Sequence, residues 1–219
     1  MRVAVIGGNG KTGRAIGNAL LADRISALPL GRSDDLAAAL RGCDAAYLIA
    51  PNLHPDEPAY VGSALEALKA AGVGRVLYHS VASPYVPEMP HHVGKAVSED
   101  LVRRSGLDWT IFQPGAYLQN FDRARPLEVP YSLDASFGFL DLHDLGRAAI
   151  RVLTEDGHVG ATYELASQVS TVAELAAEWG VTATQVADPG LHPWLSAMFA
   201  YYDAHGLPVG TRTLRALLQ

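Results

Sequence analysis

Four glycines within seven residues, directly after the first apolar run, most constrain how this chain of 219 residues can fold. Val3–Ile6 has the composition of a buried strand, and a helical pattern begins at Thr12. Glycines spaced three apart at such a turn allow a sharp bend, close approach of the backbone to a pyrophosphate, and close packing of helix on strand. The pattern predicts dinucleotide binding rather than a plain strand-to-helix turn, with contacts from Gly7, Asn9, Gly10, Lys11, Thr12 and Gly13.

The end of this run also imitates a second phosphate-binding motif. Gly10-Lys11-Thr12 matches the last three residues of G-x-x-x-x-G-K-[ST], the loop that cradles nucleoside triphosphates. That motif requires a glycine five residues before Gly10, where this chain has Val5. The sequence therefore excludes a P-loop triphosphatase and leaves the dinucleotide motif.

Apolar runs and helical stretches alternate through the first half of the chain. Strands are expected at 3–6, 27–30, 45–50, 76–80 and 109–112, and helices at 12–22, 36–40, 56–71 and 93–105. Because strands and helices alternate, the order predicts an α/β fold with a doubly wound parallel sheet, the Rossmann fold. Pro29 suits only an edge strand or a strand end, since it cannot donate a hydrogen bond to the ladder.

The pattern changes to mixed short elements near residue 120. We expect residues 1–120 to form the dinucleotide-binding core. Residues 121–219 should supply the remaining sheet and helix elements and a small C-terminal α/β lobe on the substrate side, within one compact unit.

Composition narrows the range of partners. Asp and Glu outnumber Lys and Arg by 23 to 17, a formal net charge of −6, whereas a general nucleic-acid binder needs a basic face. Cys43 is the single cysteine, so no disulfide and no cysteine-based zinc cluster forms within the chain. No apolar run approaches the roughly 20 residues of a membrane span, and residues 1–6 lead straight into a strand. We expect a cytoplasmic protein that binds neither nucleic acid nor membrane.

The end of the second strand, about 20 residues beyond the glycines, selects between the two nicotinamide dinucleotides. NAD sites place Asp or Glu there to bind the ribose 2′-OH, whereas this chain has Gly31-Arg32-Ser33. Arg32 can bind a 2′-phosphate through two parallel hydrogen bonds, with help from the Ser33 hydroxyl. Lys11 or Arg14 can assist. The sequence therefore favours NADP(H) over NAD(H), the alternative being that Arg32 is a solvated surface residue. Ser33 is also expected to cap the following helix.

With these residues in view, nearly the whole chain resembles the NmrA-like group of atypical short-chain dehydrogenases. The resemblance rests on VAVIGGNGKTGR, GCDAAYLIAP, FLDLHDLGRAAIRVL and FAYYDAHGLPVGTRTLRALL, and most specifically on HHVGKAVSEDLVRRSGLDWTIFQPGAYLQN. It implies a Rossmann domain with a small substrate-side lobe. It also implies that two loops face the nicotinamide side of the cofactor, one with Ala50 and Pro51 and the other with Pro114 and Gly115.

Ordinary short-chain dehydrogenases use a serine together with Tyr-x-x-x-Lys, whose spacing puts both side chains on one helix face. The lysine holds the ribose and lowers the tyrosine pKa, so that the phenol exchanges a proton while hydride moves. By resemblance, Lys95 and Ser80 take the lysine and serine places, but His91 stands where the tyrosine is expected. This departure puts acid catalysis by the usual route in doubt.

Two interpretations of His91 remain open. Lys95 and the start of a helix both disfavour a charged imidazole, so the His91 pKa should fall. A neutral imidazole still donates one hydrogen bond to a carbonyl oxygen, which makes His91 a candidate catalytic residue. Alternatively, His91 and His92 are polar residues of a loop-to-helix junction beside Pro90. Lys95 is expected to contact the cofactor in either case.

Tyr85 and Tyr117 are candidates for the substrate pocket, although loop or core packing explains them equally well. The apolar and aromatic face of 194–202 is expected to pack in the core and to cover the strand ends where ligands bind. None of the eight histidines pairs with another or with a carboxylate in a known ligand motif, so no metal site is expected.

Three functions are compatible with these features. The first is an oxidoreductase that transfers hydride from NADPH to a small carbonyl or quinone-type acceptor, whose reduced oxygen is weakly basic and tolerates the missing tyrosine. The second is a non-catalytic NADP-binding redox sensor that acts through a protein partner. The third and weakest is a nucleotide-sugar epimerase, which would be expected to keep the tyrosine. Both enzymes would take a small-molecule substrate, and a homo-oligomer is compatible with all three.

Overall fold

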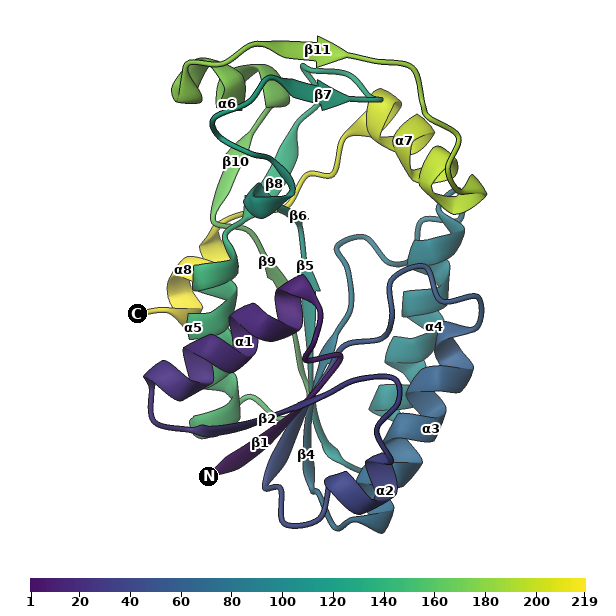
Figure 1. The fold of residues 1–219 in the computed structure, drawn as a ribbon, viewed down its shortest axis with the longest axis vertical. Helices are drawn as coiled ribbons and strands as arrows, with labels where there is room; N and C mark the ends of the chain where they lie inside the picture. Colours follow the sequence, from purple (N-terminus) through teal and green to yellow (C-terminus); the bar gives the residue numbers. More distant parts are fainter.

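Six parallel strands form the main sheet of the computed structural model, which describes residues 1–219 (Figure 1). The strand order is β2-β1-β3-β4-β5-β9, and all neighbouring strands run parallel. The strands are β1 (Arg2–Ile6), β2 (Ser26–Leu30), β3 (Ala45–Leu48), β4 (Arg75–His79), β5 (Asp108–Pro114) and β9 (Ala161–Leu165). The doubly wound parallel sheet expected from the sequence is confirmed.

Helices cover both faces of this sheet, which explains why its strands are apolar without alternation. One face packs against α1 (Lys11–Ala22), α5 (Leu142–Thr154) and α8 (Arg212–Leu217), and the other against α2 (Leu36–Ala39), α3 (Glu57–Ala70) and α4 (Pro90–Arg103). The side chains of β1 divide between these two cores, with Val3 and Val5 in the first, and Ala4 and Ile6 in the second. No helix combines the length and the apolar character that a membrane crossing requires.

The direction of strand addition reverses at β1, because β2 lies on one side of it and β3 on the other. In open parallel sheets, ligands bind outside the carboxyl ends of the strands at such a switch point. The loops after β1 and β3 meet there, since a Cβ placed on Gly7 would lie 2.7 Å from the Ile49 carbonyl oxygen. Pro29 lies in β2, the edge strand. Because β2 pairs with β1 alone, the missing N–H of Pro29 costs no hydrogen bond to a second neighbouring strand.

A small lobe stands over the carboxyl ends of the main sheet (Figure 1). It contains a three-stranded sheet in the order β10-β8-β6, a two-stranded sheet of β11 and β7, and two helices. The elements are β6 (Ala116–Tyr117), β7 (Leu127–Val129), β8 (Phe137–Leu140), β10 (Gln168–Ser170), α6 (Val172–Trp179), β11 (Ala183–Gln185) and α7 (Pro193–His205), with a 3₁₀ turn at Leu118–Asn120. A third hydrophobic core, which includes Phe137, Phe139 and Tyr202, holds the lobe together.

The second half of the chain contributes to both parts of the molecule. The chain enters the small lobe at β6, but α5 and β9 return to the main sheet, where β9 pairs with β5. After α7 the chain returns once more, and α8 joins the core under α1 and α5. Residues 121–219 therefore complete the sheet as well as building the lobe.

Some element boundaries differ from those expected. Helix α4 begins at Pro90, three residues before the expected start, because proline suits the first helical position. His91 therefore lies within its first turn. Asp35 rather than Ser33 caps α2, since the Asp35 carboxylate accepts two backbone N–H groups of that helix. The sequence does not predict β7, β8, β10 and β11, because strands this short show no clear alternation of apolar and polar residues.

Helix α1 starts in direct contact with the loop after β1. A Cβ on Gly13 would overlap the Gly7 carbonyl oxygen and would lie 2.6 Å from the Gly8 Cα, so a side chain there forces a shift. A Cβ on Gly17, one turn further along the same helix, would meet nothing within 4 Å. The two glycines therefore differ in their surroundings although they share one helix.

Gly13→Ala should lower the free energy of unfolding by about 1–3 kcal/mol, because the loop or the helix must move to relieve the overlap. Gly17→Ala is the matched control and should raise it by about 0.5–1 kcal/mol, because alanine loses less backbone entropy in a helix. Urea unfolding measures both values. Two variants of equal stability would contradict the close contact between α1 and this loop.

Candidate active site

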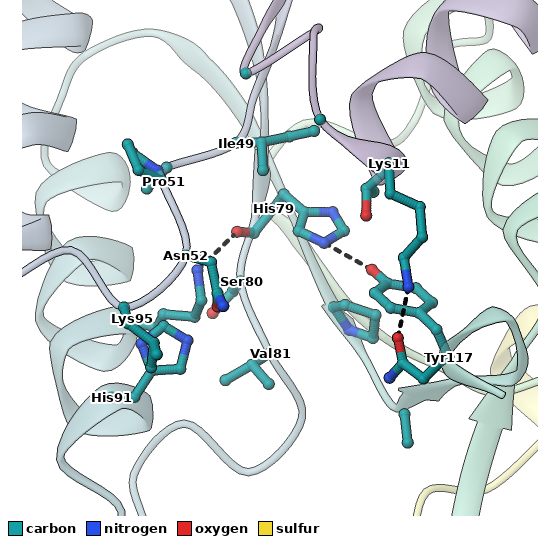
Figure 2. A pocket seen from close by; sticks show the side chains of 18 of the residues that line it. Lys11, Ile49, Pro51, Asn52, His79, Ser80, Val81, His91, Lys95 and Tyr117 are labelled. Carbon is teal, nitrogen blue, oxygen red and sulfur yellow. Dashed lines mark hydrogen bonds between the residues drawn. The ribbon is translucent and has the colours of Figure 1, made fainter. Parts of the chain in front are cut away.

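A cavity of about 910 Å³ lies between the carboxyl ends of the main sheet and the small lobe, and Figure 2 shows 18 of the residues that line it. This volume is in the range of sites that bind small molecules and cofactors. Most of the residues that the sequence assigns to a site line it, namely Gly7, Asn9, Gly10, Lys11, Thr12, Gly13, Arg32, Ala50, Pro51, Ser80, His91, Lys95, Pro114, Gly115 and Tyr117. Ser33 and Tyr85 do not.

The start of α1 offers free N–H groups to this cavity. Gly10 is the N-cap residue, no side chain caps the helix, and no acidic residue lies in its first turn. A helix N-terminus in this state attracts anions through its N–H groups and its dipole. Gly7, at φ +82°, makes the sharp bend that brings the backbone to the cavity wall. These features fit a dinucleotide pyrophosphate.

Lys11 extends from the first turn of α1 to the small lobe. Its ammonium group donates hydrogen bonds to Asn120 Oδ1 at 2.6 Å and to the Gln119 carbonyl oxygen at 3.3 Å. Burial lowers the pKa of this amine from its usual value. A cation held in place by two hydrogen bonds thus stands beside the uncapped helix, which strengthens the attraction for an anion.

Arg32 lies just beyond the end of β2, on the cavity wall. Burial raises the pKa of the nearby Tyr60 hydroxyl, and the charge of Arg32 opposes that rise. The chain turns here, since the Asp34 carboxylate accepts the Gly31 backbone N–H at 2.6 Å. Ser33 is exposed on this turn and does not line the cavity, so its contact with the cofactor stays a prediction.

The Lys95 ammonium group is buried in an ion pair. It donates to Glu57 Oε1 at 2.8 Å, and the Tyr78 hydroxyl donates to the same oxygen at 2.6 Å. Glu57 is 2% exposed, and its other oxygen, Oε2, has no hydrogen-bond partner. The His79 backbone carbonyl accepts a weaker bond from Lys95 at 3.4 Å. Lys95 therefore lines the cavity with its charge already balanced.

The Ser80 hydroxyl is engaged by a buried carboxylate. It donates to Glu99 Oε1 at 2.5 Å, and Gln113 Nε2 donates to the same oxygen at 2.7 Å. Arg103 pairs with the other Glu99 oxygen at 2.8 Å. Ser80 thus joins β4 to α4 and β5, and its proton is not free for a substrate while these contacts hold.

His91 packs against the small lobe. Its ring stacks with that of Trp194 in α7, with the centroids 6.4 Å apart and the planes at 24°. Burial, assisted by the charge of Lys95, lowers the pKa of His91 to about 4, so the ring is neutral at pH 7. The sequence predicts this direction, although burial is the larger cause. The adjacent His92 hydrogen-bonds the Tyr202 hydroxyl at 3.2 Å, a second link from α4 to α7.

A buried histidine bridges two tyrosines at the floor of the cavity. His79 Nδ1 lies 2.7 Å from the Tyr47 hydroxyl, and His79 Nε2 lies 2.7 Å from the Tyr117 hydroxyl. Burial and the nearby Lys95 lower the pKa of His79 to about 3. Burial also raises the pKa of both tyrosines, so all three side chains are neutral at pH 7. Figure 2 shows His79 between Lys95 on one side and Tyr117 on the other.

The small lobe gives the cavity an apolar wall. It contributes Tyr131, Phe137, Leu195, Met198, Phe199, Tyr202 and Leu207. Helix α7 supplies several of these side chains, so the aromatic face expected at 194–202 does cover the strand ends. Tyr85 is 73% exposed on the loop before α4 and does not line this cavity, so its place in the substrate pocket stays a prediction.

Sequence reasoning missed three buried polar residues of the site, Glu57, His79 and Glu99. Acidic residues are common in the first turn of a helix, as Glu57 is, and they need no functional explanation there. His79 ends an otherwise apolar strand directly before Ser80, and this placement is the one signal that could have identified it. The structure brings no three His, Cys, Asp or Glu side chains into a group that could hold a metal ion.

A family model described as NAD(P)H-binding matches residues 28–156, which is more than half of the chain. The chain therefore belongs to this NAD(P)H-binding family. The match includes the end of β2 and the elements that carry Lys95, His91 and Ser80.

Two curated relatives are reductases by name. The chain is 29% identical over 157 residues to an NAD(P)H azoreductase from Xenophilus azovorans, covering 68% of this chain and 54% of the relative. It is 27% identical over 150 residues to quinone oxidoreductase 2 from Escherichia coli strain K12, covering 65% of this chain and 52% of the relative. The chain spans about half the length of the curated relatives it matches.

Solved structures share the whole fold. An NADPH-dependent quinone oxidoreductase from Escherichia coli, complexed with NADPH, has a TM-score of 0.80 at 24% identity, over 99% of this chain and 94% of that chain. A nucleoside-diphosphate-sugar epimerase from Staphylococcus aureus has a TM-score of 0.83 at 18% identity, over 100% of this chain and 95% of that chain. NmrA, described as a negative transcriptional regulator, has a TM-score of 0.77 at 17% identity, over 99% of this chain and 89% of that chain. The fold of the expected NmrA-like family is thus confirmed.

Removing the charge of Lys95 should destabilise the fold, because the Glu57 carboxylate would remain buried and unpaired. We expect Lys95→Met to lower the free energy of unfolding by about 3–5 kcal/mol, and the double variant Lys95→Met/Glu57→Gln to recover much of the loss. Lys69→Met is the control, since its pair with Glu66 is exposed and should contribute about 1 kcal/mol or less. Chemical denaturation compares the three. Equally small losses in both single variants would argue against a buried pair.

Proposed function

We propose that this chain is an NADPH-dependent oxidoreductase that reduces small carbonyl or quinone-type acceptors. The observation that carries the proposal is one continuous cavity that joins the uncapped start of α1 to an aromatic wall. One end suits a dinucleotide and the other suits a planar apolar ring, so both ligands would share a single space. The relatives named azoreductase and quinone oxidoreductase support this acceptor class.

The residues that would hold the cofactor come from helix α4 and from four loops at the carboxyl ends of the strands. The glycine-rich turn would bind the pyrophosphate, and Arg32 would bind the 2′-phosphate of NADP(H). A guanidinium favours the phosphorylated cofactor because it forms two parallel hydrogen bonds with a phosphate. Lys95 and the loops at 50–51 and 114–115 would hold the nicotinamide half, in agreement with their position on the cavity wall.

Bound NADPH supplies the hydride, and the chain's own residues bind, orient and shield the reactants. His91, neutral at pH 7, can donate one hydrogen bond to the acceptor's carbonyl oxygen, with its ring held against Trp194. Ser80 would help to position the cavity wall through its hydrogen bond to Glu99, and would not contact the substrate through its hydroxyl. A quinone-type acceptor suits this set, since its reduced oxygen is a weak base and can take a proton from water.

The purified chain should oxidise NADPH in the presence of menadione or another small quinone, because hydride transfer needs only the two ligands side by side. Loss of NADPH absorbance over time is the measurement, with aldehydes and azo dyes as further acceptors. NADPH binding without turnover across this panel would contradict the reductase. That outcome would favour a redox sensor. The missing tyrosine and the hydrogen bond that ties the Ser80 hydroxyl to Glu99 support this alternative.

Arg32→Ala should raise the KM for NADPH about 10- to 100-fold and leave the KM for NADH nearly unchanged, because it removes hydrogen bonds to a charged phosphate. Arg41→Ala is the matched control, an exposed arginine that does not line the cavity. Steady-state kinetics with both cofactors provide the comparison. An equal rise in KM for NADPH and NADH would show that Arg32 does not bind the 2′-phosphate.

A further inference from the structure

Three side chains form a continuous path of hydrogen bonds from the core to the cavity. Tyr47 lies in β3, His79 in β4 and Tyr117 in β6, and both hydroxyl-to-ring distances are 2.7 Å. Two of the strands belong to the main sheet and the third to the small lobe. Figure 2 shows the bond between His79 and Tyr117 at the cavity.

The proton positions along this path follow from its buried end. Tyr47 has no exposed surface, and its hydroxyl has His79 Nδ1 as its hydrogen-bond partner. A buried O–H without an acceptor is unfavourable, so Tyr47 donates and Nδ1 accepts. The ring of His79 is neutral, because it is buried and because the charge of Lys95 opposes a second positive charge nearby. A neutral imidazole that accepts at Nδ1 carries its proton on Nε2.

It follows that His79 donates to Tyr117, and not the reverse. The Tyr117 oxygen accepts from Nε2–H at 2.7 Å. Burial raises the pKa of Tyr117, and the nearby Thr12 side chain opposes that rise. The bond to His79 is the one hydrogen bond that the Tyr117 hydroxyl makes within the chain, so Tyr117 keeps its own proton for a partner in the cavity that it lines.

The surroundings of this free O–H group favour an anion. Thr12 belongs to the first turn of α1, whose N–H groups have no cap. The Lys11 ammonium group is held nearby by Asn120. We propose that Tyr117 donates a hydrogen bond to a phosphate oxygen of the bound dinucleotide, and that Tyr47 and His79 are positioning residues that fix the direction of this donor. The identity of the ligand rests on the proposed function, whereas the direction of the path does not.

The direction can be measured without any ligand. In nitrogen-15 NMR spectra, the His79 ring should be neutral and protonated on Nε2 across about pH 5 to 8, where an ordinary histidine titrates. Loss of the signals in His79→Gln assigns them. A ring protonated on Nδ1, or one that titrates in this range, would overturn the proposed direction.

Binding tests the phosphate contact. Tyr117→Phe should raise the Kd for NADPH about tenfold or more, the effect of one hydrogen bond to a charged oxygen. The Kd for 2′-phospho-ADP-ribose, which keeps the pyrophosphate and lacks nicotinamide, should rise by the same factor. Tyr163→Phe is the matched control, because Tyr163 also bonds a histidine, His158 at 2.8 Å, but lies outside the cavity. Calorimetric titration measures each Kd, and circular dichroism verifies the fold.

The positioning role has its own readout. His79→Leu should weaken NADPH binding by a smaller factor than Tyr117→Phe, and His79→Gln should restore part of the loss, because an amide can accept from Tyr47 and donate to Tyr117. An unchanged Kd in Tyr117→Phe, when the wild-type chain binds NADPH, would overturn this inference alone. A wild-type chain that binds no dinucleotide would overturn the proposed function, and the phosphate contact with it.

Discussion

The contact between the start of α1 and the loop after β1 is the constraint on which the rest of the site depends. Gly13 lets the helix sit directly on the Gly7 and Gly8 backbone, so the helix axis is aimed at the switch point between β2 and β3. Since Gly10 brings no capping side chain, the polar groups of the first turn remain available there. The glycine-rich turn, Lys11 and Thr12 all lie at this open helix end and line the cavity.

Much of the remaining polar chemistry of the cavity is already satisfied within the protein. Lys95 pairs with Glu57, and Ser80 is engaged by Glu99. Charges this deeply buried are stable only with a partner and hydrogen bonds. Lys95 and Ser80, which resemble a dehydrogenase's lysine and serine, are therefore fixed in place by partners within the protein. Arg32, His91 and Tyr117 also line the cavity. A rigid, largely preorganised site is the result.

Local patterns account for the parts of the molecule that could be predicted. The glycine-rich turn, the apolar strands and the edge position of Pro29 each depend on a few adjacent residues, and the parallel sheet follows from their order. The polar pairs could not be predicted in this way. Glu57 and Lys95 are 38 residues apart, as are His79 and Tyr117, and Tyr47 and His79 are 32 apart. Nothing in the periodicity of either partner indicates the other, since sheet order brings them together.

The path of the chain also limits how the molecule can open. The backbone passes between the main sheet and the small lobe after β5, after β8, after β9 and again before α8. Three of these crossings lie near one edge of the main sheet, where β5 pairs with β9 and α8 packs against β9. A hinge at that edge would have to bend them together. On the side of α4, the small lobe is held by α7, through Trp194 against His91 and Tyr202 against His92. The cavity is therefore bordered by crossings of the backbone on one side and by side-chain contacts on the other, so separating α7 from α4 would open it without moving the main sheet.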